Sequence, residues 1–367
     1  MKAVMKINIY LLKILSLLFI FPALTFAQEN LSDSQIKEII KNAVENNRSS
    51  GIVVGILDEH GSRVIGYGET SKENGKTPDR YTMYEIGSVT KVFTSLLLED
   101  MSEHGELSIN DPISKFLPKN VKTPTKDGKE IKLIDLSTQT SGLPRMPDNY
   151  ILKDRSEPFA SYTADNLYSY LSNYKLTRSI GEQYEYSNTG VGLLGHILTL
   201  KTGKNYETLL RTRICNPLKM DNTVITLTTE EKNHLATGYN KRGRPAKIFD
   251  FSIFEGAGAI KSNVNDMLIF AEANLGLLKS DLYPEMLKTH EIKHLANKRD
   301  LYIGMGWHIW KKYNKEIVWH RGGTGGYTAF IGLDKQNKRA VIVLSNSSIG
   351  VSDIGLHLME SKFPIRR

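Results

Sequence analysis

Cysteine is almost absent from this chain of 367 residues, because Cys215 is the only one. A single cysteine excludes an internal disulfide framework and any metal site built from a cluster of cysteines. It also lies far from the start of the chain, which excludes a lipid anchor on an N-terminal cysteine. The remaining composition, with 40% hydrophobic and 24% charged residues, excludes collagen-like, disordered and multi-span membrane proteins.

Long hydrophobic runs are missing from the chain after its first 27 residues. That first segment has lysines, then an apolar run over residues 14–21, then Pro22 and small residues ending at Ala27. The order is typical of a secretory signal, and the run falls short of the roughly 20 residues of a membrane span. We expect residues 1–27 to be a signal peptide and the mature protein to be periplasmic or secreted, without a stable membrane span. An uncleaved anchor is the alternative.

A strong charge of one sign is also lacking. The formal net charge of +8 falls to +5 without residues 1–27, which hold three lysines and no acid. The densest basic cluster is typical of a solvated loop and comprises Lys241, Arg242, Arg244 and Lys247. Neither a basic stripe nor a recognition motif is present, so we expect no nucleic-acid partner.

Hydrophobic periodicity and turn residues predict strands at both ends of the chain and helices between them. A hairpin is expected over residues 51–68. Helices are expected over 32–46, 88–105, 133–137, 164–173, 191–201, 206–215 and 351–360. An antiparallel meander is expected from strands over 306–311, 316–319, 327–334 and 339–345.

This order predicts an α/β (α+β) fold, in which helices flank an antiparallel β-sheet and a mostly helical domain is inserted. The first part of the sheet domain is expected over residues 28–105 and its second part over 241–367. The helical domain is expected over 106–240. The length fits one large domain or two closely packed ones.

The first candidate for chemistry is the Ser-x-x-Lys segment at Ser88 and Lys91. Positions i and i+3 share a helix face, so the lysine amine can lie against the serine hydroxyl. A serine is a poor nucleophile until a neighbouring base takes its proton, and a lysine in a dry, cation-rich site has a lowered pKa. The same spacing at Ser34 and Ser172 shows that it also arises as a surface pair, but only Ser88 has an apolar, small-residue context.

The second candidate is Tyr186-Ser187-Asn188, the only Tyr-x-Asn in a chain with 17 tyrosines. A tyrosinate beside a lysine ammonium can act as a general base and later return the proton to the leaving group. Asn188 offers both a donor and an acceptor to an amide substrate. The alternative is that Ser187 or Asn188 simply caps the following helix.

The third candidate runs from His320 through Arg321, Gly322, Gly323 and Thr324, at the start of a strand pattern. Glycines let a ligand lie against a strand edge and accept main-chain hydrogen bonds. The backbone N–H groups of Gly323 and Ser88 could together hold an oxyanion. The alternative is a glycine-rich bulge between two strands.

These three motifs, in this order, resemble those of the class C serine β-lactamase family and its penicillin-binding DD-peptidase and esterase relatives. The resemblance extends from about residue 35 to residue 360. Segments with counterparts in that family are 85–94, 105–112, 136–144, 184–194, 216–221, 230–233 and 259–262. It implies a β-lactamase/transpeptidase-like fold and a serine hydrolase that needs no cofactor.

The resemblance also implies roles for single residues. Ser88 resembles the acyl-ester nucleophile, Lys91 its activating partner, Tyr186 the general base and Asn188 the contact to the substrate amide. The strand position of the family's Lys-Thr-Gly, which binds the substrate carboxylate, holds His320, Arg321 and Gly322 instead, and Thr324 follows in the family's pattern. A histidine is cationic only part of the time at neutral pH. Strand alternation is expected to point the permanent charge of Arg321 away from the site.

The implied substrate is a small-molecule β-lactam or a peptidoglycan peptide, and the protein is expected to be a monomer. We rank β-lactam hydrolysis first, D-Ala-D-Ala carboxypeptidase or endopeptidase action second and carboxyl-ester hydrolysis third. A non-catalytic penicillin-binding sensor is the alternative outside the enzymes.

Two further motifs invite other interpretations. Residues 201–203 spell Lys-Thr-Gly, but they are expected to end a helix with Gly203 as its cap. His290 and His294 fit the His-Glu-x-x-His of zinc proteases. The lysine inside that motif and the lysines around it favour an exposed helix instead, and no third ligand is evident.

Overall fold

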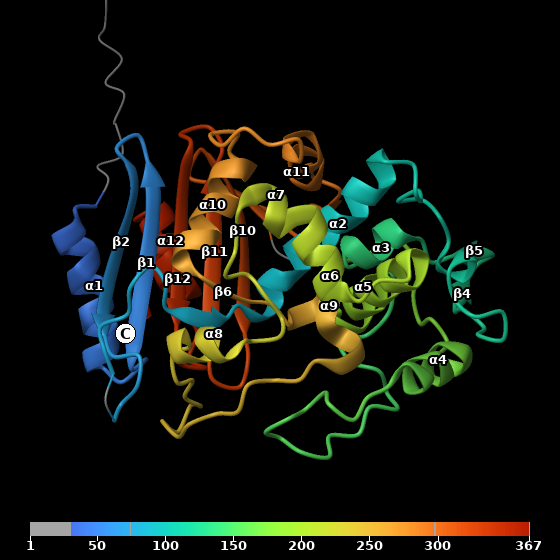
Figure 1. Cartoon of the computed structure of the whole chain (residues 1–367). Coiled ribbons are helices and arrows are strands. Elements are labelled where there is room, and N and C mark those ends of the chain that lie inside the picture. The colour runs from blue at the N-terminus through green and yellow to red at the C-terminus, as the bar shows by residue number, and fades with distance from the viewer. Residues whose placement is uncertain (1–30, 74, 297–298, 367) are drawn as a thin grey trace, which may run out of the picture. The chain divides into compact units, whose positions relative to one another are not determined.

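An antiparallel sheet of eight strands organises the protein, which is described here as a computed structural model (Figure 1). The spatial order is β2-β1-β12-β11-β10-β9-β8-β7, so the N-terminal hairpin lies beside the last strand of the chain. The strands are β1 (Gly51–Asp58), β2 (Gly61–Gly68), β7 (His294–Leu295), β8 (Leu301–Ile303), β9 (His308–Lys312), β10 (Lys315–Gly323), β11 (Thr328–Asp334) and β12 (Arg339–Ser345). The three strands β1, β11 and β12 are buried along their whole length, because helices cover both faces of the sheet.

One face of the sheet is covered by α1 (Asp33–Glu45) and α12 (Ser352–Met359), and the other by α10 (Val264–Asn274). Helix α1 begins with a capping box, in which Ser32 and Gln35 exchange side-chain and backbone hydrogen bonds. Helix α10 approaches β1 so closely that a Cβ at Gly55 would lie 2.6 Å from Val264. The glycine therefore permits the close packing of helix on strand.

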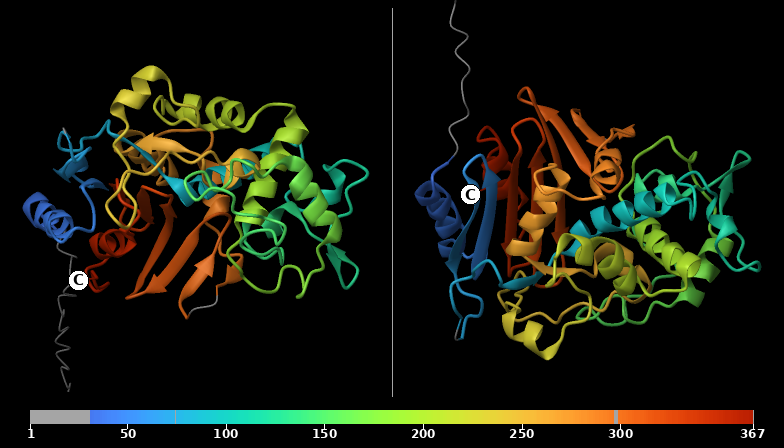
Figure 2. Two further views of the ribbon diagram at one scale, coloured as in Figure 1. Left: turned by 90° about the horizontal axis from the view of Figure 1, so that it is seen from below. Right: turned by 45° about the horizontal axis from the view of Figure 1, so that its top comes forward.

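A helix-rich part lies beside the β10 side of the sheet (Figure 2). Its buried core contains the nonpolar faces of α2 and α5, which pack on each other and on α9. The remaining helical elements of the described chain are η1 (Gly87–Val89), α2 (Thr90–Glu103), η2 (Ile113–Lys115), α3 (Leu133–Ser137), α4 (Ala164–Asn173), α5 (Asn188–Thr202), α6 (Tyr206–Leu210), the π-helical η3 (Arg211–Cys215), α7 (Asn216–Leu218), α8 (Thr229–His234), η4 (Ser252–Phe254), α9 (Glu255–Gly258) and α11 (Tyr283–Thr289). Two small sheets pair β3 (Met83–Glu85) with β6 (Lys261–Asn263) and β4 (Thr125–Lys126) with β5 (Lys129–Glu130).

The structure describes residues 31–73, 75–296 and 299–366. The expected signal peptide, residues 1–27, lies outside the described residues. Ser32–Arg367 is one compact unit, and the expected division at residues 105 and 240 stays a prediction. Within the described ranges, no helix has the length and apolar character needed to cross a membrane.

Most expected elements are confirmed, and α3, α4 and β12 have the predicted bounds. The helix expected over 206–215 instead passes from α6 into the π-helical η3. The glycine-rich motif lies at the end of β10 and not at the start of the next strand, because β10 runs on past Trp319 to Gly323. The strands β3 and β6 were not predicted, since three residues show no periodicity.

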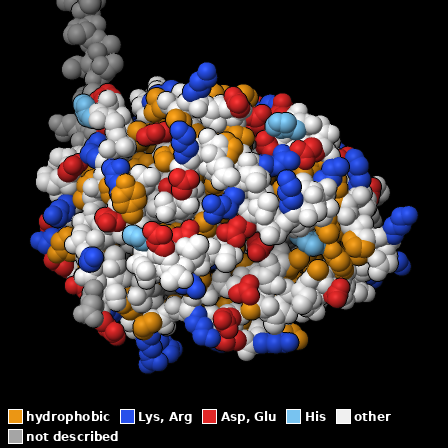
Figure 3. All heavy atoms as spheres, in the orientation of Figure 1, with side chains coloured by type: hydrophobic (Ala, Val, Ile, Leu, Met, Phe, Trp, Pro, Cys, Tyr) orange, Lys and Arg blue, Asp and Glu red, His pale blue; other side chains and the backbone are white. Residues whose placement is uncertain are grey.

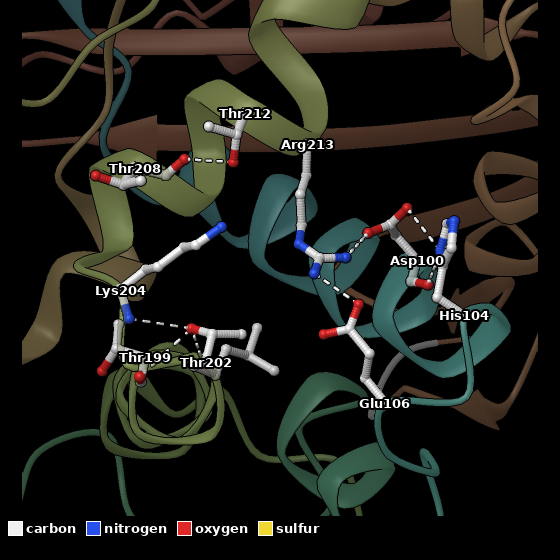
Figure 4. Close-up of polar contacts among 10 residues, drawn as sticks. Asp100, His104, Glu106, Thr199, Thr202, Lys204, Thr208, Thr212 and Arg213 are labelled. Carbon is white, nitrogen blue, oxygen red and sulfur yellow. Dashed lines mark hydrogen bonds and ion pairs between the residues drawn. The ribbon is translucent and has the colours of Figure 1, made fainter.

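A polar cluster fixes the far end of α2 (Figure 4). Arg213 donates to Asp100 at 2.7 Å and to Glu106 at 2.6 Å, while His104 contacts Asp100 from the next turn. The guanidinium thus joins α2, and Glu106 in the segment just after it, to η3. Since α2 follows directly after Ser88, this cluster helps to hold the helix that carries Lys91.

Lysine, arginine and acidic side chains alternate over the face shown in Figure 3, with no large area of one sign. The predicted solvated loop is confirmed, because the four basic residues from Lys241 to Lys247 are all exposed. This face therefore offers no extended basic surface to a nucleic-acid backbone.

Candidate active site

Ser88 lies in η1, at the junction between β3 and α2. The preceding Gly87 has a φ of +51°, and a Cβ there would lie 2.7 Å from the backbone nitrogen of Gly323. Glycine is therefore required both by the backbone conformation and by the approach of β10. The tight turn presents the half-buried Ser88 against the end of β10, while α2 begins directly behind it.

Lys91 is fully buried one turn after Ser88, as the Ser-x-x-Lys spacing predicts. Its Nζ lies 3.1 Å from Ser88 Oγ, 2.9 Å from Asn188 Oδ1 and 2.6 Å from the carbonyl oxygen of Ala257. Burial, followed by the charge of Arg145, holds the pKa of the Lys91 amine well below its usual range. A neutral Lys91 amine donates its two hydrogens to Asn188 Oδ1 and the Ala257 carbonyl oxygen, which can only accept. Its lone pair can then accept the proton of the Ser88 hydroxyl.

Tyr186 meets the same serine from another part of the chain. Its phenol shares a side-chain hydrogen bond with Ser88, and Lys91 Nζ lies 5.0 Å from the centroid of its ring. Burial raises the pKa of Tyr186, whereas the Ser88 hydrogen bond and the charges of Arg145 and Arg321 lower it. The net direction is upward, so the free protein holds a neutral phenol beside a lysine that loses its proton easily.

Asn188 and Ser187 serve the helix and the site together. Ser187 is the N-cap of α5, and its Oγ accepts a hydrogen bond from Gly190 N at 2.8 Å. Asn188 accepts from Lys91, and its amide nitrogen faces Met146 Sδ at 3.8 Å. The capping function that we predicted as an alternative is thus present, and the residue after the cap points at the lysine.

His320 lies behind Tyr186, with the two ring centroids 6.4 Å apart, and is only 1% exposed. Its Nδ1 lies 2.8 Å from the carbonyl oxygen of Arg321, which can only accept, so Nδ1 carries the proton. In the described part of the chain, Nε2 has no hydrogen-bond partner. Burial, then the charges of His308 and Lys91, hold the pKa of His320 well below its usual range, although the Arg321 carbonyl opposes them.

The glycines at the end of β10 lie against η1. A Cβ at Gly322 would lie 1.8 Å from Ile86 O and 3.0 Å from Ser88 N, so only glycine fits there. A Cβ at Gly323 would meet nothing closer than 3.7 Å. The backbone of Gly322 and Gly323 therefore lies directly beside that of Gly87 and Ser88, where two N–H groups are expected to hold an oxyanion.

Thr324 Oγ1 donates to Glu85 Oε2 at 2.7 Å, and Phe249 N donates to the other oxygen of the same carboxylate at 2.8 Å. Glu85 is 1% exposed, and its burial raises its pKa. The expected substrate contact of Thr324 stays a prediction, but its hydroxyl is already engaged. Glu85 thus joins the turn after β10 to β3.

The sequence profile described as Beta-lactamase matches residues 36–356, which is most of the chain. The chain belongs to the β-lactamase family. The family and fold resemblance stated from the motifs is thereby confirmed. Ser88, Lys91 and Tyr186 of this β-lactamase-family protein are brought together within one site, although they come from far-separated segments.

Relatives fall into two functional groups by name. A β-lactamase from Yersinia enterocolitica is 27% identical over 79% of this chain and 73% of its own length. The D-alanyl-D-alanine-carboxypeptidase/endopeptidase AmpH of Escherichia coli is 27% identical over 86% of each chain. A solved β-lactamase/D-alanine carboxypeptidase from Yersinia pestis, complexed with citrate, matches with a TM-score of 0.76 and 25% identity over 86% of this chain and 93% of its own. A class C β-lactamase from Rhodobacter sphaeroides, at 23% identity and TM-score 0.76 over 85% and 94% of the two chains, shares the fold.

The two other motifs lie outside this site. Lys201 and Thr202 end α5, and Gly203 is its left-handed cap at a φ of +68°, which confirms the prediction. The exposed helix expected over 290–294 is wrong, because α11 ends at Thr289 and His290 is buried against Asn274. His294 lies on β7, so the two histidines do not share a helix. Among the described residues, no group of three or more His, Cys, Asp or Glu is arranged to hold a metal.

Sequence reasoning missed several residues of the site. Arg145 lies over the Tyr186 ring, with Cζ 5.1 Å from its centroid, and Ala257 supplies the carbonyl to Lys91. His308 contacts His320 at 5.1 Å between ring centroids and Tyr184 Oη at 2.9 Å. A backbone carbonyl gives no signal in a sequence. The one sequence signal for Arg145 is its position directly after the matched segment 136–144.

We expect His320 to remain neutral well below pH 6.5. Its pKa is lowered in the folded state, so as the pH falls below 6.5 the unfolded chain takes up a proton that the folded chain refuses. This residue's contribution to stability therefore decreases on acidification.

NMR of the histidine rings would show the His320 signals unchanged to pH 5.5, with the proton on Nδ1. The exposed His104, whose pKa Asp100 raises, is an internal reference that titrates. Parallel titration of both rings would contradict the neutral assignment.

Proposed function

We propose that the protein is a periplasmic or secreted serine hydrolase that forms an acyl-enzyme on Ser88, with β-lactam amides as its substrates. The observation that supports this most strongly is the convergence of Lys91 Nζ and the Tyr186 phenol on Ser88 Oγ. The names of the relatives support the substrate class.

In the acylation step, Ser88 Oγ attacks the lactam carbonyl carbon while its proton passes to the neutral amine of Lys91. The backbone N–H groups of Ser88 and Gly323 hold the resulting oxyanion. Tyr186 then donates its phenol proton to the leaving nitrogen as the carbon–nitrogen bond breaks. The raised pKa of Tyr186 and the lowered pKa of Lys91 favour this assignment, in which the lysine and not the tyrosine is the first base.

Deacylation reverses these proton movements. The Tyr186 phenolate takes a proton from water, and the hydroxide attacks the ester carbonyl. Lys91 returns its proton to Ser88 Oγ as the ester bond breaks, which restores the free enzyme. Between the two half-reactions, the phenolate lies beside the Lys91 ammonium and the guanidinium of Arg145, which stabilise it.

D-Ala-D-Ala carboxypeptidase or endopeptidase action is the second candidate. It is favoured by the match to AmpH over 86% of both chains. The chemistry at Ser88 is the same, and only the rate of deacylation and the leaving group differ.

Steady-state hydrolysis of nitrocefin should be compared with release of D-alanine from a muropeptide. We expect nitrocefin turnover to be the faster of the two, and Ser88→Ala to abolish both. Ser34→Ala is a matched control, since Ser34 has the same Ser-x-x-Lys spacing on an exposed helix face, and it should keep full activity. Release of D-alanine without nitrocefin turnover would make the peptidase the function. Stoichiometric labelling by a penicillin with no turnover of any substrate would indicate a sensor.

A further inference from the structure

The family's strand lysine supplies a cation to the substrate, and the residue at that position in this chain cannot do so. His320 is 1% exposed, and its Nδ1–H is donated to the carbonyl oxygen of Arg321. Its other nitrogen then has a lone pair, which repels a carboxylate. A substrate anion must therefore find its positive partner elsewhere in the site.

Arg145 places such a cation on the ring of Tyr186. Its Cζ lies 5.1 Å from the ring centroid, and its side chain is exposed. The backbone of Arg145 is fixed to the start of α5, because its carbonyl oxygen accepts from Asn188 N at 3.0 Å and Thr189 N at 3.3 Å. The neighbouring Pro144 carbonyl accepts from Ser187 Oγ at 2.7 Å. The guanidinium is thus presented by a segment that is bound to the Tyr186 motif itself.

The charge of Arg145 is not neutralised within the protein. Arg48, Arg63 and Arg213 each form a salt bridge with a carboxylate at 2.8 Å or less. In the part of the chain that the structure describes, neither Arg145 nor Arg321 has such a partner. The charges of both arginines therefore act on Tyr186 without a matching acid, and they oppose the rise that burial gives to the pKa of its phenol.

The proposed proton transfer from Tyr186 to the leaving nitrogen predicts where an anionic group of the substrate would bind. If Tyr186 gives its proton to the leaving nitrogen, the carbon bonded to that nitrogen also lies close to the Tyr186 ring. Penicillins and cephalosporins, like D-alanyl-D-alanine peptides, carry a carboxylate on the carbon that stays bonded to the leaving nitrogen. A guanidinium binds a carboxylate through two parallel hydrogen bonds, which a histidine or a lysine cannot match.

We propose that Arg145 is the receptor for the substrate carboxylate on the leaving-group side. The inference rests on the proposed function of Ser88 and deepens it, because it restricts the substrates to acyl compounds with a carboxylate next to the scissile nitrogen. Arg145 is thereby a specificity-determining residue, contributed by a loop in place of the strand.

The test uses a matched pair of substrates, benzylpenicillin and its methyl ester, and the ratio of their kcat/KM values. In the wild type, the acid should be preferred. Arg145→Gln should lower kcat/KM for the acid about 10- to 100-fold more than for the ester, the effect of losing a charge-assisted pair. Arg145→Lys should restore part of the ratio, and Arg321→Gln should reduce it less. Arg155→Gln, at an exposed arginine of the loop before α4, is the matched control and should leave the ratio unchanged.

The ratio of kcat/KM for acid and ester distinguishes binding of the carboxylate by Arg145 from a general effect of Arg145 on catalysis. An equal fall for acid and ester in Arg145→Gln would show that Arg145 acts only on Tyr186 or Lys91, and the inference would be overturned. It would be overturned as well if His320→Gln, and not Arg145→Gln, abolished the preference. If the wild type hydrolyses both compounds without preference, this inference alone fails. If the wild type neither hydrolyses them nor takes up a fluorophosphonate at Ser88, the proposed function fails with it.

Discussion

Replacement of Lys91 by methionine is expected to lower the rate of acylation about 10²–10⁴-fold, the usual range for loss of a general base. Methionine fills nearly the same volume, but it cannot accept the Ser88 proton. The carbonyl of Ala257 and Oδ1 of Asn188 lose their donor as well, which costs about 1–3 kcal/mol for each unsatisfied buried group. The rate of fluorophosphonate labelling, followed by intact-mass spectrometry, measures the effect on acylation directly.

Two further variants make the Lys91 result specific. Lys201→Met changes a lysine of the exposed Lys-Thr-Gly segment at the end of α5 and should label at the wild-type rate. Lys91→Arg keeps a cation but cannot supply a neutral amine, so it should be as slow as Lys91→Met. Wild-type labelling by a folded Lys91→Arg protein would show that the charge, and not the base, is what Ser88 needs.

Replacement of Gly322 by alanine is expected to damage both stability and activity. The new Cβ would lie 1.8 Å from Ile86 O and 2.8 Å from Ile86 C, and both atoms belong to backbone that cannot move aside alone. The end of β10 must then separate from η1, at a cost of about 1–3 kcal/mol or more in the free energy of unfolding. A displacement of about 1 Å in an active site can lower the rate 10²-fold, so we expect at least that loss in turnover.

Gly323→Ala provides the matched control, because its Cβ would lie 3.7 Å from Thr328 Cγ2 and its backbone N–H is kept. Urea unfolding and fluorophosphonate labelling should therefore show a large loss of stability and labelling rate in Gly322→Ala and a much smaller loss in Gly323→Ala. Gly350→Ala, with no atom within 4 Å of its Cβ, gives the baseline for the effect of an added methyl group. Equal stability and labelling in Gly322→Ala and Gly323→Ala would contradict the close contact of β10 with η1.

Elements with strong local signals could be predicted from the sequence. Helix α4 begins at a Thr163 cap with Asn166 in the capping box, and its apolar periodicity ends at Asn173. The hairpin of β1 and β2 is marked by turn residues between two apolar runs. Such elements owe their bounds to contacts within a few residues, which the sequence shows directly.

A predicted contact within the site is confirmed where a motif fixes the spacing of the two residues, as at Ser88 and Lys91. Long-range packing decided the rest. His290 looks like part of a charged surface segment, but it is buried against Trp307 and Asn274, and burial lowers its pKa to about 3. Arg145 has no recognisable motif of its own, and its approach to Tyr186 depends on how the loop after α3 folds back on α5.

The protonation state of His320 and the effect of the Arg321 charge on the site could not be predicted from the sequence. From the sequence, His320 is expected to be a partial cation, and strand alternation is expected to direct the charge of Arg321 away from the site. In the structure the histidine is neutral because it is buried and its N–H is engaged. Burial raises the pKa of both Tyr184 and Tyr186, and the charge of Arg321 opposes this rise, so it acts on the site despite strand alternation.

The central claim is that the hydroxyl of Ser88 becomes acylated, and peptide mapping after incubation with a penicillin tests it most directly. Digestion and tandem mass spectrometry should find one adduct of the penicillin mass, on the peptide that contains Ser88, and none in Ser88→Ala. An adduct on a different residue, or equal labelling of the alanine variant, would contradict the account.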